Sequence, residues 1–442
     1  MRVFSASLIF CLCASWCSAA GAAEDWPQFR GPSGDGLSTA VNLPATWSET
    51  ENIVWKTPVE GKGWSSPVVA DGVAWLTSAV VTPVDEATRE KIRQEKLANN
   101  PVANQMDIVG PVKLFVVGID VATGKQVDRI DLFDVAEPDP IHSLNSYASP
   151  SPILRDGKLF CHFGKFGTAC VDLASRKILW QRNLVIDHSV GPGSSPILWQ
   201  DKLIIPCDGI DEQYVTALDA STGKTAWKTN RPPLTGDRGD SHKAFATPLA
   251  VTQNGKTQVI VPGAQWFVAY DPTSGDELWR FRHGDGFSNV PRPVVRGDLA
   301  YLCTGFMVPE LCAVRIGGEQ DVTDSHLAWR HKRQVPSMTS PIIVGDEVYF
   351  VSDQGVLSCL DASSGELLWQ KRLTGNFSAS PLFADGKLYF CSREGATTVL
   401  RPGKAYDELA INQLDGQLMA SPAAIDGALL LRSDTHLYRV GK

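Results

Sequence analysis

A two-residue step that ends in proline recurs along the chain and constrains its fold more than any other sequence feature. A short apolar run and a turn follow each step. The residues that precede the eight prolines are Ser66, Ser151, Ser195, Thr247, Arg292, Ser340, Ser380 and Ser421. Successive prolines lie 85, 44, 52, 45, 48, 40 and 41 residues apart. Apart from the first interval, a period of about forty to fifty residues is that of a four-stranded propeller blade.

The interior of each unit supports the same architecture. A second apolar strand follows the first turn, and a third strand ends in Asp before a turn of the form D-x-x-[ST]-G-[KDE]. The fourth strand carries a Trp, as in residues 217–227, 269–279 and 359–369. The Asp can accept hydrogen bonds from the turn, and the Gly can take a left-handed conformation. We expect each Trp to fill the gap between neighbouring sheets, burying about 200 Å².

This motif resembles the tryptophan-docking repeat of quinoprotein dehydrogenases, in the pyrroloquinoline-quinone-repeat family of β-propellers. The barrel-assembly lipoprotein of bacterial outer membranes shares that family. The resemblance covers residues 50–442 and implies an all-β, eight-bladed propeller of four-stranded antiparallel blades at 52–442. The last unit, from Ser421, has room for only three strands. We therefore expect residues 52–58, which include Trp55, to supply the fourth strand and close the ring.

Residues 1–23 have the pattern of a secretory signal peptide, with a basic Arg2, a short apolar stretch and several small-residue cleavage positions. The stretch is too short for a transmembrane helix, and Trp16 before Cys17 does not fit a lipoprotein signal. We expect a monomeric protein that is periplasmic or secreted. The net charge of −8 and the lack of a Lys/Arg-rich run argue against nucleic acid or an anionic membrane as a partner.

Two further segments lie outside the repeat pattern. Residues 24–51 are expected to form a non-repeating arm, packed on the outside of the ring by Trp26 and Phe29. The long first interval holds an insertion at about 81–112, whose first part is typical of a helix that Thr82 caps. We expect the insertion to project from the rim that carries the loops between blades, either as a solvated decoration or as a lid.

Seven cysteines follow the expected cleavage site, too few and too scattered for a disulfide scaffold. The absence of CxxC and CxxCH excludes the signatures of thioredoxin-like sites, structural zinc sites and attached c-type haem. Two pairs have the same separation, Cys161/Cys170 and Cys303/Cys312, and we expect the members of each pair to face one another across a hairpin. Cross-strand disulfides and buried free thiols both stay open.

Common catalytic signatures are absent, so the sequence predicts no catalytic residue and no metal ligand. The eight residues before the prolines are expected to ring one mouth of the central channel, each hydroxyl bonding its local turn. For Arg292 two roles stay open, a bidentate donor to a carboxylate or another anion, and a salt bridge to a nearby Asp. Loops on the same rim add further candidate binding residues: His142, Tyr147, His188, Arg231, Asp240 and His242.

Three functions stay open, and we favour a binding module over an enzyme. The favoured function is an exported, non-catalytic scaffold of the cell envelope that binds a protein or glycan on the propeller rim. The resemblance also implies a quinoprotein oxidoreductase, which holds pyrroloquinoline quinone with calcium between a stacking Trp and a disulfide of adjacent cysteines. This chain has no adjacent cysteines and no matching set of calcium ligands. The third function is a polysaccharide lyase or hydrolase that uses His and Arg of the funnel. A role in outer-membrane protein assembly would follow by fold analogy alone.

Overall fold

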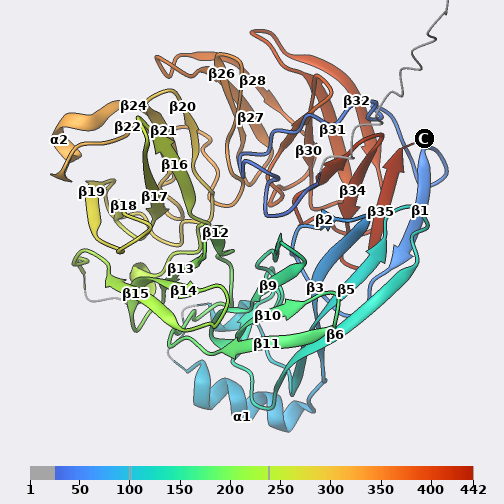
Figure 1. The fold of residues 1–442 in the computed structure, drawn as a ribbon. Coiled ribbons are helices and arrows are strands. Elements are labelled where there is room, and N and C mark those ends of the chain that lie inside the picture. The colour runs from blue at the N-terminus through green and yellow to red at the C-terminus, as the bar shows by residue number, and fades with distance from the viewer. Residues whose placement is uncertain (1–24, 99, 101, 237–238, 442) are drawn as a thin grey trace, which may run out of the picture.

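Eight antiparallel sheets stand around a central channel in the computed structural model, which describes residues 25–98, 100, 102–236 and 239–441 (Figure 1). Each sheet has four main strands, of which the first in each unit lies next to the channel. The predicted all-β, eight-bladed propeller is therefore confirmed. The predicted signal peptide lies outside the described residues.

The strands of the first four blades run outwards from the channel in chain order. They are β2 (Val68–Ala70), β3 (Val73–Val81), β5 (Val112–Asp120) and β6 (Gln126–Val135); β8 (Ile153–Arg155), β9 (Lys158–His162), β10 (Thr168–Asp172) and β11 (Lys177–Arg182); β12 (Ile197–Trp199), β13 (Lys202–Asp208), β14 (Gln213–Asp219) and β15 (Thr225–Asn230); and β16 (Leu249–Gln253), β17 (Lys256–Pro262), β18 (Trp266–Tyr270) and β19 (Glu277–Arg282).

The last four blades follow the same plan, except that the outermost strand of the eighth comes from the start of the chain. They are β20 (Val294–Arg296), β21 (Leu299–Cys303), β22 (Leu311–Arg315) and β24 (Leu327–His331); β25 (Ile342–Val344), β26 (Glu347–Val351), β27 (Val356–Asp361) and β28 (Leu367–Arg372); β29 (Leu382–Ala384), β30 (Lys387–Cys391), β31 (Ala396–Arg401) and β32 (Asp407–Gln413); and β33 (Ala423–Ile425), β34 (Ala428–Arg432), β35 (His436–Gly441) and β1 (Ile53–Pro58).

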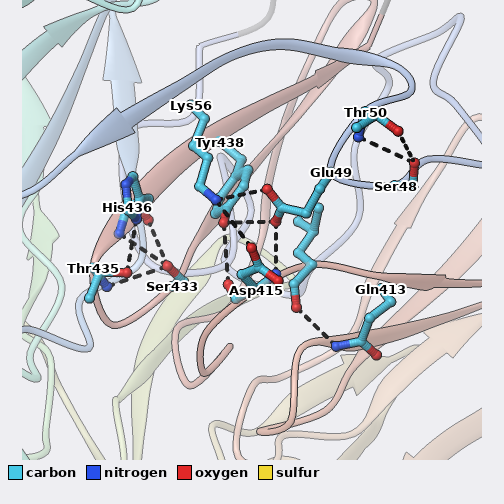
Figure 2. Close-up of polar contacts among 11 residues, drawn as sticks. Ser48, Glu49, Thr50, Lys56, Gln413, Asp415, Ser433, Thr435, His436 and Tyr438 are labelled. Carbon is cyan, nitrogen blue, oxygen red and sulfur yellow. Dashed lines mark hydrogen bonds and ion pairs between the residues drawn. The ribbon is translucent and has the colours of Figure 1, made fainter.

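Strand β1 closes the ring by pairing antiparallel with β35, as the sequence predicts. A polar cluster next to this joint ties the preceding loop to it (Figure 2). Glu49 accepts hydrogen bonds from Lys56 Nζ at 2.7 Å, from the Tyr438 hydroxyl at 3.0 Å and from the Asp415 amide at 2.8 Å. The closure therefore combines main-chain pairing with a carboxylate that receives three donors.

Tryptophans on the outermost strands dock onto the next blade, as predicted. Five of them donate from Nε1 to a main-chain carbonyl of the neighbouring turn at 2.8–3.0 Å: Trp55, Trp180, Trp227, Trp329 and Trp369. The turn glycine makes this contact fit, because a Cβ on Gly223 would lie 2.7 Å from the Trp180 ring.

Trp279 of the fourth blade is an exception to this docking pattern. It donates to Gln258 of its own blade at 2.6 Å. The turn of the fifth blade that would receive it is replaced by β23 (Gln320–Asp321) and α2 (Thr323–His326), and β23 pairs parallel with β19. The added strand therefore covers the edge of the fourth blade that carries Trp279.

The first part of the N-terminal arm lies inside the ring, so the prediction that Trp26 and Phe29 pack it on the outside is wrong. Trp26 is fully buried and exchanges two main-chain hydrogen bonds with Val69 of β2. Further along, Leu154 of β8 donates to the Pro27 carbonyl and Phe383 of β29 donates to the Gly36 carbonyl. The innermost strands leave one edge unpaired toward the channel, and the arm satisfies several of these groups. We call residues 26–38 the plug, the blue segment in the middle of the ring (Figure 1).

The insertion of the first blade carries α1 (Glu86–Lys96), η1 (Ala103–Gln105) and β4 (Met106–Asp107). Asp85 rather than Thr82 caps α1, because its side chain accepts a hydrogen bond from the Thr88 amide at 2.7 Å. Strand β4 pairs with β7 (Ile141–His142), which brings the end of the insertion back to the channel mouth. Two short 3₁₀ turns complete the structure, η2 (Gly164–Phe166) and η3 (Gly239–His242).

The paired cysteines do not face one another, so that prediction is wrong. Cys161 lies opposite Ala169, and Cys303 lies opposite Leu311, each one residue short of the expected partner. Because side chains alternate across a sheet, the two members of a pair point to opposite faces. All seven cysteines of the described residues are buried free thiols.

Candidate functional site

A cup of about 800 Å³ opens at the mouth of the channel where the chain enters each innermost strand. Seven of the eight residues that precede the repeat prolines line it, and Arg292 does not. Phe29 of the plug also lines the cup, on the channel side. The plug therefore helps to close the bottom of the cup, and its shape depends on the arm as well as on the blades.

We expected the hydroxyls before the prolines to bond their own turns. In the structure they link neighbouring blades instead. Six of the seven hydroxyls accept a hydrogen bond from the amide of the equivalent residue one blade earlier, at 2.9–3.1 Å. Arg292 interrupts the circle because a guanidinium cannot accept. The Ser66 hydroxyl has no hydrogen-bond partner. These six bonds occupy most of the hydroxyls, so the ring is chiefly structural.

The wall of the cup is rich in methionine and aromatic side chains. It contains Trp64, Phe245, Phe287 and Phe306, together with Met307, Met338 and Met419. Three of the chain's five methionines therefore lie in this one place. The loop between β21 and β22 is also exposed toward solvent, with accessible fractions of 52% for Phe306, 68% for Met307 and 59% for Val308. Three consecutive exposed apolar residues are unusual on a protein surface.

The charged groups of the cup are partly engaged by one another or by the main chain. Lys243, largely buried, donates to Asp240. Asp353 accepts from the amides of Ser337 and Met338 at 3.0 and 3.2 Å, and burial raises the pKa of its carboxyl. Arg393 donates from Nε to Ser378 at 2.7 Å and from Nη2 to the Met338 sulfur at 3.0 Å, and burial lowers the pKa of its guanidinium.

Two of the seven predicted site residues line the cup, His142 and Asp240. The His142 ring accepts from the Leu144 amide through Nδ1, which leaves Nε2 to donate to Gln105 Oε1 at 3.0 Å. Burial lowers the pKa of this imidazole. It therefore contributes a hydrogen-bonded and largely uncharged group to the rim.

Four of the remaining predicted residues serve the fold around the cup. The Tyr147 hydroxyl donates to the Asp139 carbonyl at 2.7 Å, and His242 Nε2 donates to the Gly236 carbonyl at 3.1 Å. Arg231 forms a buried two-bond ion pair with Asp208. The His188 ring is buried beside Phe245, with centroids 6.3 Å apart.

Among the described residues Arg292 forms no ion pair with an Asp, so the expected salt bridge is wrong, and the side chain does not line the cup. Its side chain is buried below the cup, where Nε donates to the Pro248 carbonyl at 3.0 Å and Nη1 donates to the Phe29 carbonyl at 2.6 Å. It thus holds the plug by main-chain contacts.

Sequence reasoning missed the side chains that the second-to-third strand loops bring to the cup, among them Met307, Asp353 and Arg393. The apolar triplet at 306–308 was the available signal. The loops between second and third strands lie on the same rim as the loops between blades. An apolar tip on such a loop is therefore expected near the channel mouth.

A sequence model of the family described as outer membrane protein assembly factor BamB matches residues 38–229, 211–351 and 321–418. These overlapping matches cover most of the ring. The chain belongs to this family. The repeat that suggested a pyrroloquinoline-quinone-type propeller is the one that the match spans.

Known structures agree with the BamB family fold. BamB from Moraxella catarrhalis superposes with a TM-score of 0.56 at 14% identity, over 88% of this chain and 99% of that one. Quinohemoprotein alcohol dehydrogenase ADHIIG from Pseudomonas putida HK5 gives 0.59 at 12% identity, over 95% and 80%. Identities this low carry the fold and nothing further.

One curated protein related to this BamB family member is an enzyme, the 1-butanol dehydrogenase (quinone) of Thauera butanivorans. The two are 23% identical over 223 residues, which is 46% of this chain and 33% of that enzyme. The match therefore spans a third of the dehydrogenase. No helix in the described part of the chain is long and apolar enough to cross a bilayer.

The cup does not fit pyrroloquinoline quinone with calcium as the resemblance implies. Within the described residues, no three His, Cys, Asp or Glu side chains converge as metal ligands, and every cysteine is a free thiol. Trp64 could stack on a flat ring, but Lys62 already lies over one of its faces at 5.3 Å. The quinone carries three carboxylates, whereas the cup cations Lys243 and Arg393 already have partners.

Proposed function

We propose that this chain is an exported, non-catalytic binding module of the cell envelope, and that its cup receives an apolar segment of a partner protein. The observation that carries the proposal is the concentration of methionine and aromatic side chains on the wall of the cup. Methionine is unbranched and polarisable, so a methionine-lined surface adapts to side chains of different shape. A site of this kind suits protein segments that vary in sequence.

The dimensions and polarity of the cup support a peptide rather than a glycan. A volume of about 800 Å³ is in the range of ligand sites and can hold several side chains. A glycan needs many free donors and acceptors, whereas Lys243 and Arg393 already have partners and six ring hydroxyls already accept from a main-chain amide. The exposed loop at 306–308 extends the apolar surface beyond the mouth.

A groove of about 640 Å³ continues from the cup between the fifth and sixth blades. It shares Met307, Ser337, Asp353 and Gln354 with the cup, so the two hollows are contiguous. An extended segment could therefore lie in the groove and place an apolar side chain in the cup. The export part of the proposal rests on the signal-like pattern of residues 1–23.

Fluorescence polarisation with the purified mature chain tests the proposal. The probes are labelled twelve-residue peptides of graded apolar content, labelled cello- and chito-oligosaccharides, and pyrroloquinoline quinone with and without calcium in a parallel calorimetric titration. We expect the apolar peptides to bind, and Phe306→Ser or Met338→Glu to weaken that binding at least tenfold, about 1.4 kcal/mol.

Ile411→Ser is the matched control, because Ile411 is 57% exposed and lies on outer strand β32, away from the cup. It should leave peptide binding unchanged. Binding of an oligosaccharide alone, or binding of the quinone that calcium strengthens, would replace the proposal with the corresponding alternative.

A further inference from the structure

Two cationic side chains meet in the plug at the centre of the ring. Arg30 and Arg292 are each only 2% exposed. They lie close together, because Arg292 donates to the carbonyl of Phe29, the residue next to Arg30. Burial lowers the pKa of Arg292, and the nearby Arg30 charge lowers it further. Two guanidinium charges in one buried place repel each other and are costly without a compensating anion.

The compensation that the protein itself supplies is incomplete. Arg30 donates from Nη2 to the Asp35 carbonyl at 2.6 Å, while its Nε and Nη1 are buried without an acceptor. Asp35 is the acidic group that acts on both arginines, yet its carboxylate is bonded to the Ser33 hydroxyl and the Leu37 amide. Buried polar groups nearly always have partners. Five other arginines of the described residues have a buried Nε without an acceptor, but only Arg30 has two such nitrogens, which points to a ligand.

Arg231 is a buried arginine whose charge is compensated by a carboxylate of the same chain. Its side chain is only 4% exposed, and Asp208 accepts two hydrogen bonds from it. Neither Arg30 nor Arg292 forms such an ion pair among the described residues. Burial lowers the pKa of Arg30 to about 10 and that of Arg292 to about 9, because no carboxylate pairs with either guanidinium to offset the loss of hydration.

We propose that the plug holds a small inorganic anion of the halide class, such as chloride, against the guanidinium groups of Arg30 and Arg292. The anion supplies the missing negative charge and accepts from the free Arg30 donors. It has to be small, because the plug backbone is packed against both side chains. A Cβ added to Gly34 would lie 2.5 Å from Arg292 Nη1, and one added to Gly36 would lie 2.7 Å from Arg30 Nη2.

The site is separate from the cup and does not depend on the proposed function. An ion that binds only the folded chain raises the unfolding midpoint as its concentration increases. At constant ionic strength, replacing gluconate with chloride up to a hundredfold excess over its dissociation constant should raise the midpoint by roughly 3 °C. Arg30→Met should abolish this dependence. Arg231→Met, which removes a guanidinium that has its own carboxylate, should lower the midpoint but keep the dependence.

Anomalous diffraction from bromide-soaked crystals of the unmodified protein gives a second readout that needs no variant to fold. We expect a bromide peak within hydrogen-bond range of both guanidinium groups. The absence of such a peak overturns the proposal. So does a chloride dependence that survives in Arg30→Met, because the ion would then bind elsewhere.

Discussion

Acid should destabilise this propeller steeply, because three histidines are buried between its blades. His162, His188 and His283 are 2%, 5% and 4% exposed. Burial lowers their pKa values from 6.5 to about 3, 4 and 4, so the folded chain keeps all three neutral at pH 5. In the unfolded chain the same imidazoles are solvated and take up protons near pH 6.5.

The sign and the size of the effect follow from proton linkage. Between about pH 4 and pH 6.5 the unfolded state binds one more proton per histidine, so the free energy of unfolding falls by about 1.4 kcal/mol per pH unit for each. From pH 8 to pH 5 each histidine therefore removes about 2 kcal/mol, and the three together remove about 6 kcal/mol. A typical domain has only about 5–15 kcal/mol to lose.

Urea unfolding followed by circular dichroism at pH 8, 6.5 and 5 measures this loss. His188→Leu is the most direct variant, because neither ring nitrogen of His188 has a hydrogen-bond partner to sacrifice. It should reduce the loss between pH 8 and pH 5 by about 2 kcal/mol. Ile186→Val, a core variant two residues away, should instead lower the free energy of unfolding by the same amount at pH 8 and at pH 5. A variant His188→Leu that keeps the full pH dependence would refute the reasoning.

Four further substitutions probe the joints between blades by denaturant unfolding. Trp227→Ala should cost about 3–5 kcal/mol, because a buried ring and its hydrogen bond to the next blade are lost; a cost below 1 kcal/mol would contradict the docking role. Ser151→Ala should cost about 1–3 kcal/mol by leaving the buried Ser66 amide without an acceptor, whereas Ser66→Ala should be nearly neutral because its hydroxyl has no partner. Glu49→Gln should cost about 1 kcal/mol at pH 7. Partial burial raises the pKa of Glu49, but three hydrogen bonds outweigh it and hold the pKa below 4.5, so this difference should shrink as the pH falls below that value.

The fold was predictable because a repeat states the same structural information many times. The units repeat a turn and an apolar strand, and most of them a Trp on the outermost strand, so an irregular copy such as the one around Trp279 does not obscure the period. The shared pattern also located the closing strand near Trp55. Errors arose where a single residue decides the outcome. Cys161 and Cys170 point to opposite faces because the strand register differs by one residue from the one we assumed.

The site was less predictable because it belongs to the parts of the chain that do not repeat. The repeat indicated the channel mouth and the ring hydroxyls, but it carried no information on where the arm goes. The arm determines where the Arg292 side chain lies, because its guanidinium donates to the Phe29 carbonyl of the arm instead of pointing to the mouth. The apolar wall comes largely from loop tips such as Met307, whose role depends on which loops meet in space.

The plug and the closing strand set the order in which the molecule can be completed. Both come from the first part of the chain, yet their partners include residues close to its other end: Phe383 pairs with the segment at 36–38, and Val440 pairs with Ile53. During synthesis these N-terminal segments emerge first, and although the plug can pair early with Val69, its contacts with Phe383 and the pairing of β1 must wait for the last blades. Contacts this distant in sequence make folding slow and leave strand edges exposed meanwhile. Closure of the ring is therefore a late step of folding. Loss of the final strand, β35, would also leave β1 without its partner.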